Sequence, residues 1–103
     1  MKLKMFCVYD SKAQAYLQPF FMAASGLAIR AFESEANNPQ SQFCSYPADF
    51  TLFEIGEYDA LQGSVSTLSA KINLGTALQF KNKPTDQMPL LSNVSPIAQG
   101  GVQ

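Results

Sequence analysis

Few side chains of this sequence could carry out chemistry by themselves. The chain contains no histidine, the commonest general base in enzymes and the commonest metal ligand. Its two cysteines, Cys7 and Cys44, therefore lack the base that activates a cysteine nucleophile. They could form a disulfide, but two reduced thiols fit better because nothing else marks a secreted disulfide scaffold. We expect no catalytic site, no metal site and no cofactor, and therefore not an enzyme.

Three carboxylates lie close together in one stretch, at Glu54, Glu57 and Asp59. Carboxylate oxygens are the ligands that hard cations prefer. The same pattern is typical of solvated charges that discourage pairing at the edge of a sheet. We favour the second interpretation.

A further group combines cations with aromatic rings. Lys2 and Lys4 fall on the same face of a predicted strand as Phe6. Aromatic side chains stack on unpaired bases, at about 1–3 kcal/mol per base, and basic side chains contact phosphates. The candidate contacts to single-stranded DNA are the cations Lys2, Lys4, Lys12 and Arg30 and the aromatic residues Tyr16, Phe20 and Phe21. The alternative is that these rings only fill a core or a dimer interface.

Length and charge limit these possibilities. A chain of 103 residues forms one domain. Its net charge of −1 argues against a protein that holds nucleic acid by bulk electrostatic attraction. The N-terminus lacks the apolar run of a signal peptide, and no segment approaches the roughly 20 apolar residues of a membrane span. We therefore expect a soluble protein without a membrane partner.

The first elements that would position these residues are two strands. Residues 2–9 alternate with period two, which predicts a strand. Residues 15–22 predict its hairpin partner. Pro19 cannot donate a hydrogen bond to a neighbouring strand, so this second strand either lies at an edge or breaks at Pro19.

A helix follows the two strands. Ser25 is a plausible N-cap, and the helix runs to about Asn37. Its predicted buried stripe is Ala28, Phe32 and Ala36, at a spacing of four residues. A polar loop is expected from there to residue 48.

The second half predicts strands at 50–58 and 64–68, and one more at 72–80 that Gly75 interrupts. The fold class is therefore α+β. An antiparallel sheet of four or five strands, in the order β-β-α-β-β, carries one helix on one face. Residues 1–81 form the single domain, and residues 82–103 form an extended or disordered tail.

One helix covers only one face of such a sheet, yet apolar residues point to both faces. Phe20 and Phe21 are neighbours and should diverge, as should Phe6 and Cys7. An uncovered apolar face is unusual for a monomer. A second copy, the tail or stacked bases could cover it, and we expect a homodimer.

Several segments together resemble a known family. The segments are YDSK at 9–12, AYLQPFF at 15–21, AIRAF at 28–32, PADFTLFEIGEYD at 47–59 and LGTALQFK at 74–81. In this order and spacing they resemble the small non-structural protein of gokushovirus-type microviruses, which are single-stranded DNA phages. The resemblance covers about residues 1–81.

The resemblance implies a non-structural, DNA-binding protein in the bacterial cytoplasm of the host. Its implied role lies in the switch from duplex replication to single-strand synthesis and packaging. The resemblance supplies no catalytic residues. An adaptor that binds a phage replication or scaffold protein, or a host protein, without contacting DNA is the alternative. The apolar sheet face or the tail would then be its contact surface.

Overall fold

The structure is a computed structural model, and it describes residues 1–81. The elements in chain order are β1 (Lys2–Asp10), β2 (Ala15–Tyr16), β3 (Phe20–Met22), α1 (Ser25–Ala36), α2 (Gln42–Ser45), the short 3-10 helix η1 (Pro47–Asp49), β4 (Phe50–Asp59), β5 (Ser64–Thr76) and α3 (Ala77–Phe80). The predicted tail at 82–103 lies outside the described residues.

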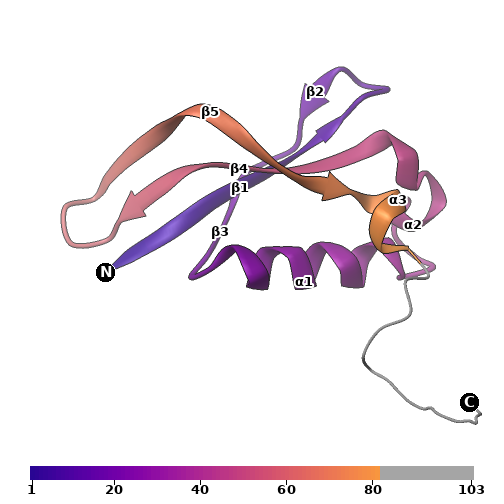
Figure 1. Ribbon diagram of the computed structural model, residues 1–103, viewed down its shortest axis with the longest axis horizontal. Helices are drawn as coiled ribbons and strands as arrows, with labels where there is room; N and C mark the ends of the chain where they lie inside the picture. The colour runs from indigo at the N-terminus through magenta and orange to yellow at the C-terminus, as the bar shows by residue number, and fades with distance from the viewer. Residues whose placement is uncertain (82–103) are drawn as a thin grey trace, which may run out of the picture.

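The strands form one five-stranded antiparallel sheet with the order β2-β1-β4-β5. β3 pairs with β1 on the same side as β2. α1 runs along one face of this sheet, as Figure 1 shows, and no helix in the described part of the chain covers the other face. The predicted α+β class with an antiparallel sheet and one covering helix is confirmed.

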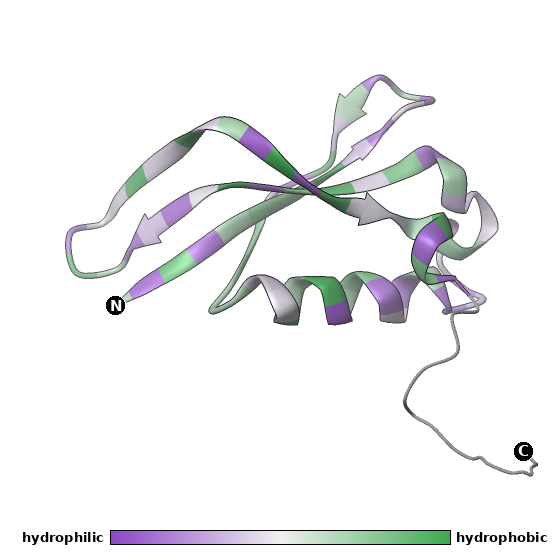
Figure 2. Ribbon diagram, in the orientation of Figure 1, coloured by the Kyte–Doolittle hydropathy of each residue, from purple (hydrophilic) through white to green (hydrophobic). Residues whose placement is uncertain are grey.

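The core lies between α1 and the sheet. α1 buries Ala28, Phe32 and Ala36, the stripe that the sequence predicts. The sheet supplies Phe6 and Val8 from β1, together with Phe50 and Leu52 from β4. Alternate residues of β1 and β4 face α1, because successive side chains of a strand point to opposite sides. Figure 2 shows that hydrophilic and hydrophobic residues follow each other at the start of β1.

The start of α1 differs from the prediction. Ala24 is the N-cap residue, with an extended backbone (φ −149°, ψ 153°), and Ser25 is already the first helical residue. No side chain caps this end of the helix. The N–H groups of Leu27 and Ala28 both donate to the Ala24 carbonyl. The helix ends as predicted, with Asn37 as its C-cap.

The hairpin partner of β1 breaks in the region of Pro19, as expected. β2 and β3 lie on either side of this proline, and both pair with β1. The polar loop expected up to residue 48 instead contains α2 and the start of η1. Ser41 caps α2, since its hydroxyl accepts from the Phe43 N–H at 3.1 Å.

The end of the sheet also differs from the prediction. One strand, β5, replaces the two expected at 64–68 and 72–80, and residues 77–80 are helical. Thr76 and Gln79 explain the change, because they form a capping box at the start of α3. The Gln79 N–H donates to the Thr76 hydroxyl at 3.3 Å, and the Thr76 N–H donates to the Gln79 Oε1 at 2.7 Å.

β5 carries a wide bulge opposite the middle of β4. Gly56 pairs with Thr67, whereas Glu54 pairs with Ile72. Ile55 alone therefore faces the four residues Leu68 to Lys71. The extra residues lift β5 out of the ladder, and Figure 1 shows the resulting arch on the face opposite α1.

Replacing Gly56 with alanine should destabilise the sheet at this bulge. A Cβ at residue 56 would collide with the backbone carbonyl oxygen of Ser66, which cannot turn away as a side chain could. We expect a loss of about 1–3 kcal/mol in the free energy of unfolding, measured by urea denaturation. Gly26→Ala is the matched control, since no atom lies within 4 Å of its Cβ position. Equal losses in the two variants would contradict the predicted collision.

Candidate functional site

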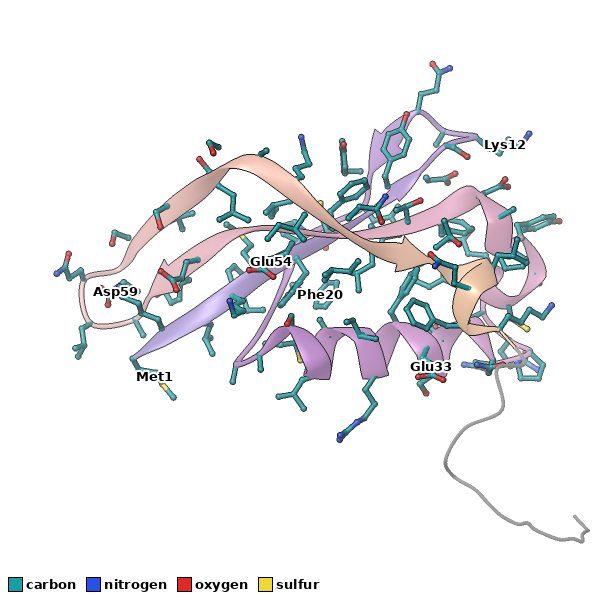
Figure 3. The ribbon with its side chains drawn as sticks, in the orientation of Figure 1. Met1, Lys12, Phe20, Glu33, Glu54 and Asp59 are labelled. Atoms are coloured by element: carbon teal, nitrogen blue, oxygen red, sulfur yellow. The ribbon has the colours of Figure 1, made fainter. Side chains whose placement is uncertain are left out.

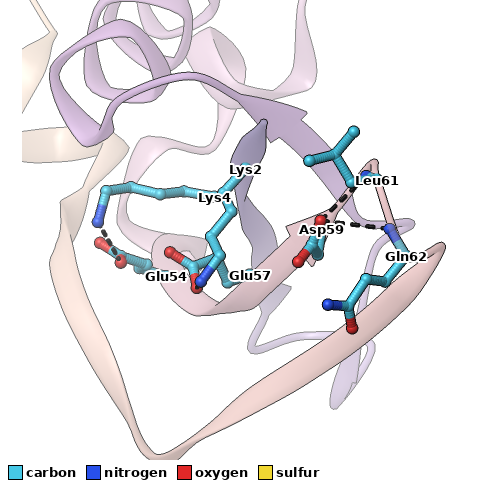
Figure 4. A network of polar contacts seen from close by, with 7 residues as sticks. All are labelled: Lys2, Lys4, Glu54, Glu57, Asp59, Leu61 and Gln62. Atoms are coloured by element: carbon cyan, nitrogen blue, oxygen red, sulfur yellow. Dashed lines mark hydrogen bonds and ion pairs between the residues drawn. The ribbon is translucent and has the colours of Figure 1, made fainter.

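The three carboxylates of β4 are engaged with other groups rather than gathered. Glu54 Oε2 lies 3.3 Å from Lys4 Nζ, and Glu57 Oε1 lies 3.8 Å from Lys2 Nζ (Figure 4). Asp59 accepts from the N–H groups of Leu61 and Gln62, at 3.0 and 3.3 Å, and so closes its own turn. Within residues 1–81, no group of three His, Cys, Asp or Glu side chains could hold a metal ion.

The interpretation of these carboxylates as solvated edge charges was wrong for Glu54. β4 is an inner strand, with β1 on one side and β5 on the other. Glu54 is only 8% exposed. The Lys4 ammonium offsets part of the cost of burying the carboxylate.

Lys2 and Lys4 also bear on the predicted DNA contacts. Lys4 and Phe6 share one face of β1, as predicted, and Phe6 is fully buried in the core on the side of α1. Each lysine lies beside a glutamate of β4. An exposed ion pair is weak, so Lys2 keeps its capacity to contact a phosphate better than the half-covered Lys4 does.

Lys12 and Arg30 lie apart from this pair. Lys12 is exposed in the turn between β1 and β2, where Figure 3 places it at the tip of the hairpin. Arg30 is exposed on α1 and lies two residues from the buried Ala28, which turns it away from the sheet. The structure therefore does not bring the four predicted cations to one surface.

The predicted aromatic contacts divide between the two faces of the sheet. Phe20 lies between the sheet and α1 (Figure 3) and stacks on Phe6, with ring centroids 5.6 Å apart. Phe21 points the other way and contacts Tyr58 at 5.8 Å. Their divergence confirms that apolar side chains occupy both faces. Of the two, Phe21 lies on the open face, which we define as the face without α1.

Tyr16 forms the centre of an aromatic cluster on the open face. Its ring lies 4.8 Å from Tyr9 and 6.1 Å from Phe53, measured between centroids. The Lys71 ammonium lies 5.4 Å from the Tyr16 centroid, a cation–π contact. Tyr16 remains 47% exposed. Sequence reasoning selected Tyr16 but missed Lys71, because Lys71 fell between two predicted strands.

Tyr16 also lines a groove of about 360 Å³, which we call the open-face groove. The segment that connects β2 to β3 forms one wall of the groove, and the β5 bulge forms the other. Cys7 and Ile55, from β1 and β4, belong to its lining. The lining residues are Cys7, Tyr16, Leu17, Pro19, Ile55, Thr67, Leu68 and Lys71. The groove combines apolar walls with a single cation, which suits a flat, apolar ligand that carries negative charge.

Both cysteines are free, as expected. Cys7 is buried in the groove lining, and burial raises the pKa of its thiol above the ordinary value of 9.0. The charge of Lys71 opposes this increase in pKa by favouring the thiolate. Cys7 is therefore a neutral, apolar part of the groove at neutral pH.

This shift predicts a loss of stability in alkali. The folded state holds the Cys7 proton more tightly than the unfolded state does, so its contribution is complete below pH 9.0 and falls as the pH rises through the folded pKa. Urea denaturation between pH 8 and 10.5 should show a steeper decline for the wild type than for Cys7→Ala. Parallel declines would contradict the prediction, because the two proteins differ only at residue 7.

The model of the Phage ORF5 protein family matches residues 3–80 of the chain. The chain belongs to this family. The match includes every residue of the open-face groove and almost the whole described fold.

The family match establishes a phage protein, and the resemblance to phage sequences is confirmed at that level. Comparison of this ORF5-family chain with curated proteins and with solved structures gives no match. No helix in the described part of the chain has the length and apolar character needed to cross a membrane.

Proposed function

We propose that this ORF5-family protein binds single-stranded DNA in its open-face groove. It acts as a non-catalytic accessory protein in the genome synthesis or packaging of a gokushovirus-type microvirus, in the cytoplasm of the bacterial host. The proposal combines the sequence resemblance with the family match and with the chemistry of the groove.

The observation that carries the proposal is the contact between Tyr16 and Lys71. Tyr16 offers a half-exposed ring on which a base can stack, and Tyr9 and Phe53 hold that ring from the sides. The Lys71 ammonium lies over the same ring, so a base that stacks there would displace it toward the phosphate of its own nucleotide. Stacking on aromatic rings beside a cation is how sequence-tolerant single-strand binding proteins hold DNA.

The positions of the charged side chains favour an affinity for DNA that depends only weakly on salt concentration. Lys2 and Lys4 lie beside glutamates, and among residues 1–81 neither Lys12 nor Lys71 has a carboxylate within ion-pair distance. Each phosphate contact to a single strand adds about 0.7 to the slope of log affinity against log salt. The single cation of the groove, Lys71, predicts a slope of about 0.7, and stacking then supplies much of the affinity.

Fluorescence anisotropy of a labelled oligo-dT, titrated with the full chain from low to physiological salt, tests the proposal. We expect saturable binding with the shallow slope, and weaker binding to a duplex of equal length, because paired bases cannot stack in the groove. No binding at low salt, where electrostatic attraction is least screened, would contradict the proposal.

The exposed part of β5 favours a second candidate, an adaptor that binds a phage or host replication protein without contacting DNA. Val65, Leu68 and Ile72 are large apolar side chains that remain exposed on this strand. Failure to bind oligo-dT would favour this function. Deletion of residues 82–103 then tests whether the tail makes the contact. If the shortened chain still captures a replication protein, the tail is excluded as the contact surface.

A further inference from the structure

The two edges of the sheet are protected differently. On one side, β2 and β3 are short and are separated by Pro19, which limits pairing with another chain. On the other side, β5 is 13 residues long, and no strand from residues 1–81 lies beyond it. Such an edge presents a row of backbone N–H and C=O groups that another strand can pair with.

The first half of β5 lacks the features that usually prevent pairing at the edge of a sheet. Residues 60–70 contain no charged side chain and no proline. Ser64 to Leu68 are all exposed, and Val65 is among the large apolar side chains open to solvent. The second half is guarded, because the strand is distorted beyond Leu68, where the bulge begins, and Lys71 adds a charge. The open template is therefore Ser64–Leu68, which we call the β5 edge.

We propose that the β5 edge pairs with the β5 edge of a second copy of this chain. The two strands run antiparallel about a two-fold axis beside Ser66. Val65 then faces Thr67 of the partner, and Ser64 faces Leu68 of the partner. The pairing joins two sheets into one.

Self-pairing suits this strand better than pairing with a foreign one. A charged edge would face its own charge across the two-fold axis, and like charges opposite each other destabilise a sheet. The β5 edge has no charge to repel its copy and none to select an oppositely charged partner. Its mixture of Ser, Thr and Val side chains provides the hydroxyl and β-branched pairs that stabilise adjacent strands.

The proposed symmetry has a consequence for the groove. A two-fold axis between antiparallel strands of one sheet stands perpendicular to the sheet, so both copies keep the same face up. Both α1 helices then lie on one side and both open-face grooves on the other. The turn between β4 and β5 extends beyond the start of α1, as Figure 1 shows, so neither helix lies under the tip of this hairpin.

The interface is small, because it involves five residues of each strand and their neighbours. An area below about 1,200 Å² is typical of weak, transient complexes. The dimer should therefore form and dissociate reversibly with concentration. The proposed dimer does not depend on the proposed binding of DNA.

Sedimentation velocity of the full chain over a concentration series tests the proposal. The wild type should change from monomer to dimer as concentration rises, and Ser66→Lys should shift this transition at least tenfold higher. Ser66→Asp should do the same, and an equal mixture of the two variants should dimerise at least as well as the wild type. Ser69→Lys is the matched control, because Ser69 is exposed in the bulge outside the paired residues.

Two outcomes would overturn the proposal. The first is a wild type that stays monomeric at every concentration. The second is a dimer that Ser66→Lys leaves unchanged, since the interface must then lie elsewhere. Cross-linking supplies a separate check, with one cysteine at a time introduced at 64–68 after Cys44 is replaced by serine, so that the buried Cys7 is the only other thiol. The yield of disulfide-linked dimer should be highest at residue 66, and a dimer without any such cross-link would also overturn it.

Discussion

Replacing Leu52 with alanine should remove about 2–5 kcal/mol from the free energy of unfolding. Leu52 is fully buried in the core between β4 and α1. The deletion costs the transfer free energy of the lost groups and leaves a cavity that the surrounding rings fill only in part. A domain of this size has a total stability of about 5–15 kcal/mol, so the variant should lose a large part of it. Urea denaturation followed by circular dichroism measures the change.

Leu61→Ala is the control for this prediction, because it removes the same groups from a side chain that is 85% exposed. Surface substitutions of this kind usually change stability by less than about 0.5 kcal/mol. Similar losses in the two variants would mean that the core does not lie between α1 and the sheet.

Replacing Tyr16 with alanine should weaken the binding of oligo-dT by about 1–3 kcal/mol, which is roughly 5- to 150-fold in Kd. The variant loses the ring on which a base stacks, together with its contacts to Tyr9 and Phe53. Anisotropy titrations at one low salt concentration give the ratio of dissociation constants. Circular dichroism should show that the variant remains folded, since Tyr16 is exposed and lies outside the core cluster.

Tyr46→Ala is the aromatic control, because Tyr46 is exposed and lies at the end of α2, outside the groove lining. It should bind oligo-dT as the wild type does. Equal weakening in the Tyr16 and Tyr46 variants would show that the binding does not depend on the groove.

Substitutions of single cations test which of them contacts a phosphate of the bound DNA. Lys71→Gln should lower the salt slope by about 0.7, which corresponds to the loss of one phosphate contact. Arg30→Gln removes an equal charge from the outer side of α1 and should leave the slope unchanged. A larger decrease in the salt slope for Arg30→Gln than for Lys71→Gln would place the DNA-binding site on α1, where the sequence predicts a phosphate contact at Arg30.

Patterns within single elements predicted much of the fold. The alternation of β1 assigned Phe6 and Cys7 to opposite faces, and the structure places Phe6 in the core and Cys7 in the groove. The four-residue spacing of Ala28, Phe32 and Ala36 identified the buried side of α1. These features depend on local geometry, which period and residue type record directly.

Features that depend on pairing between distant residues were not predictable. The contact of Lys4 with Glu54 joins residues 50 positions apart, and nothing near Glu54 in the sequence marks it as buried. The bulge that brings Lys71 to Tyr16 arises from the register between β4 and β5. The capping box at Thr76 and Gln79 is different, because its spacing is visible in the sequence and would have identified α3.

Photo-cross-linking with an oligo-dT that carries 5-iododeoxyuridine tests the central claim most directly. The modified base bonds on irradiation to aromatic side chains that it stacks against, and mass spectrometry identifies the linked residue. The groove predicts cross-links to Tyr16, or to its neighbours Tyr9 and Phe53. Cross-links confined to α1 or to Tyr46, or no cross-link at a saturating protein concentration, would contradict a DNA-binding site on the open face.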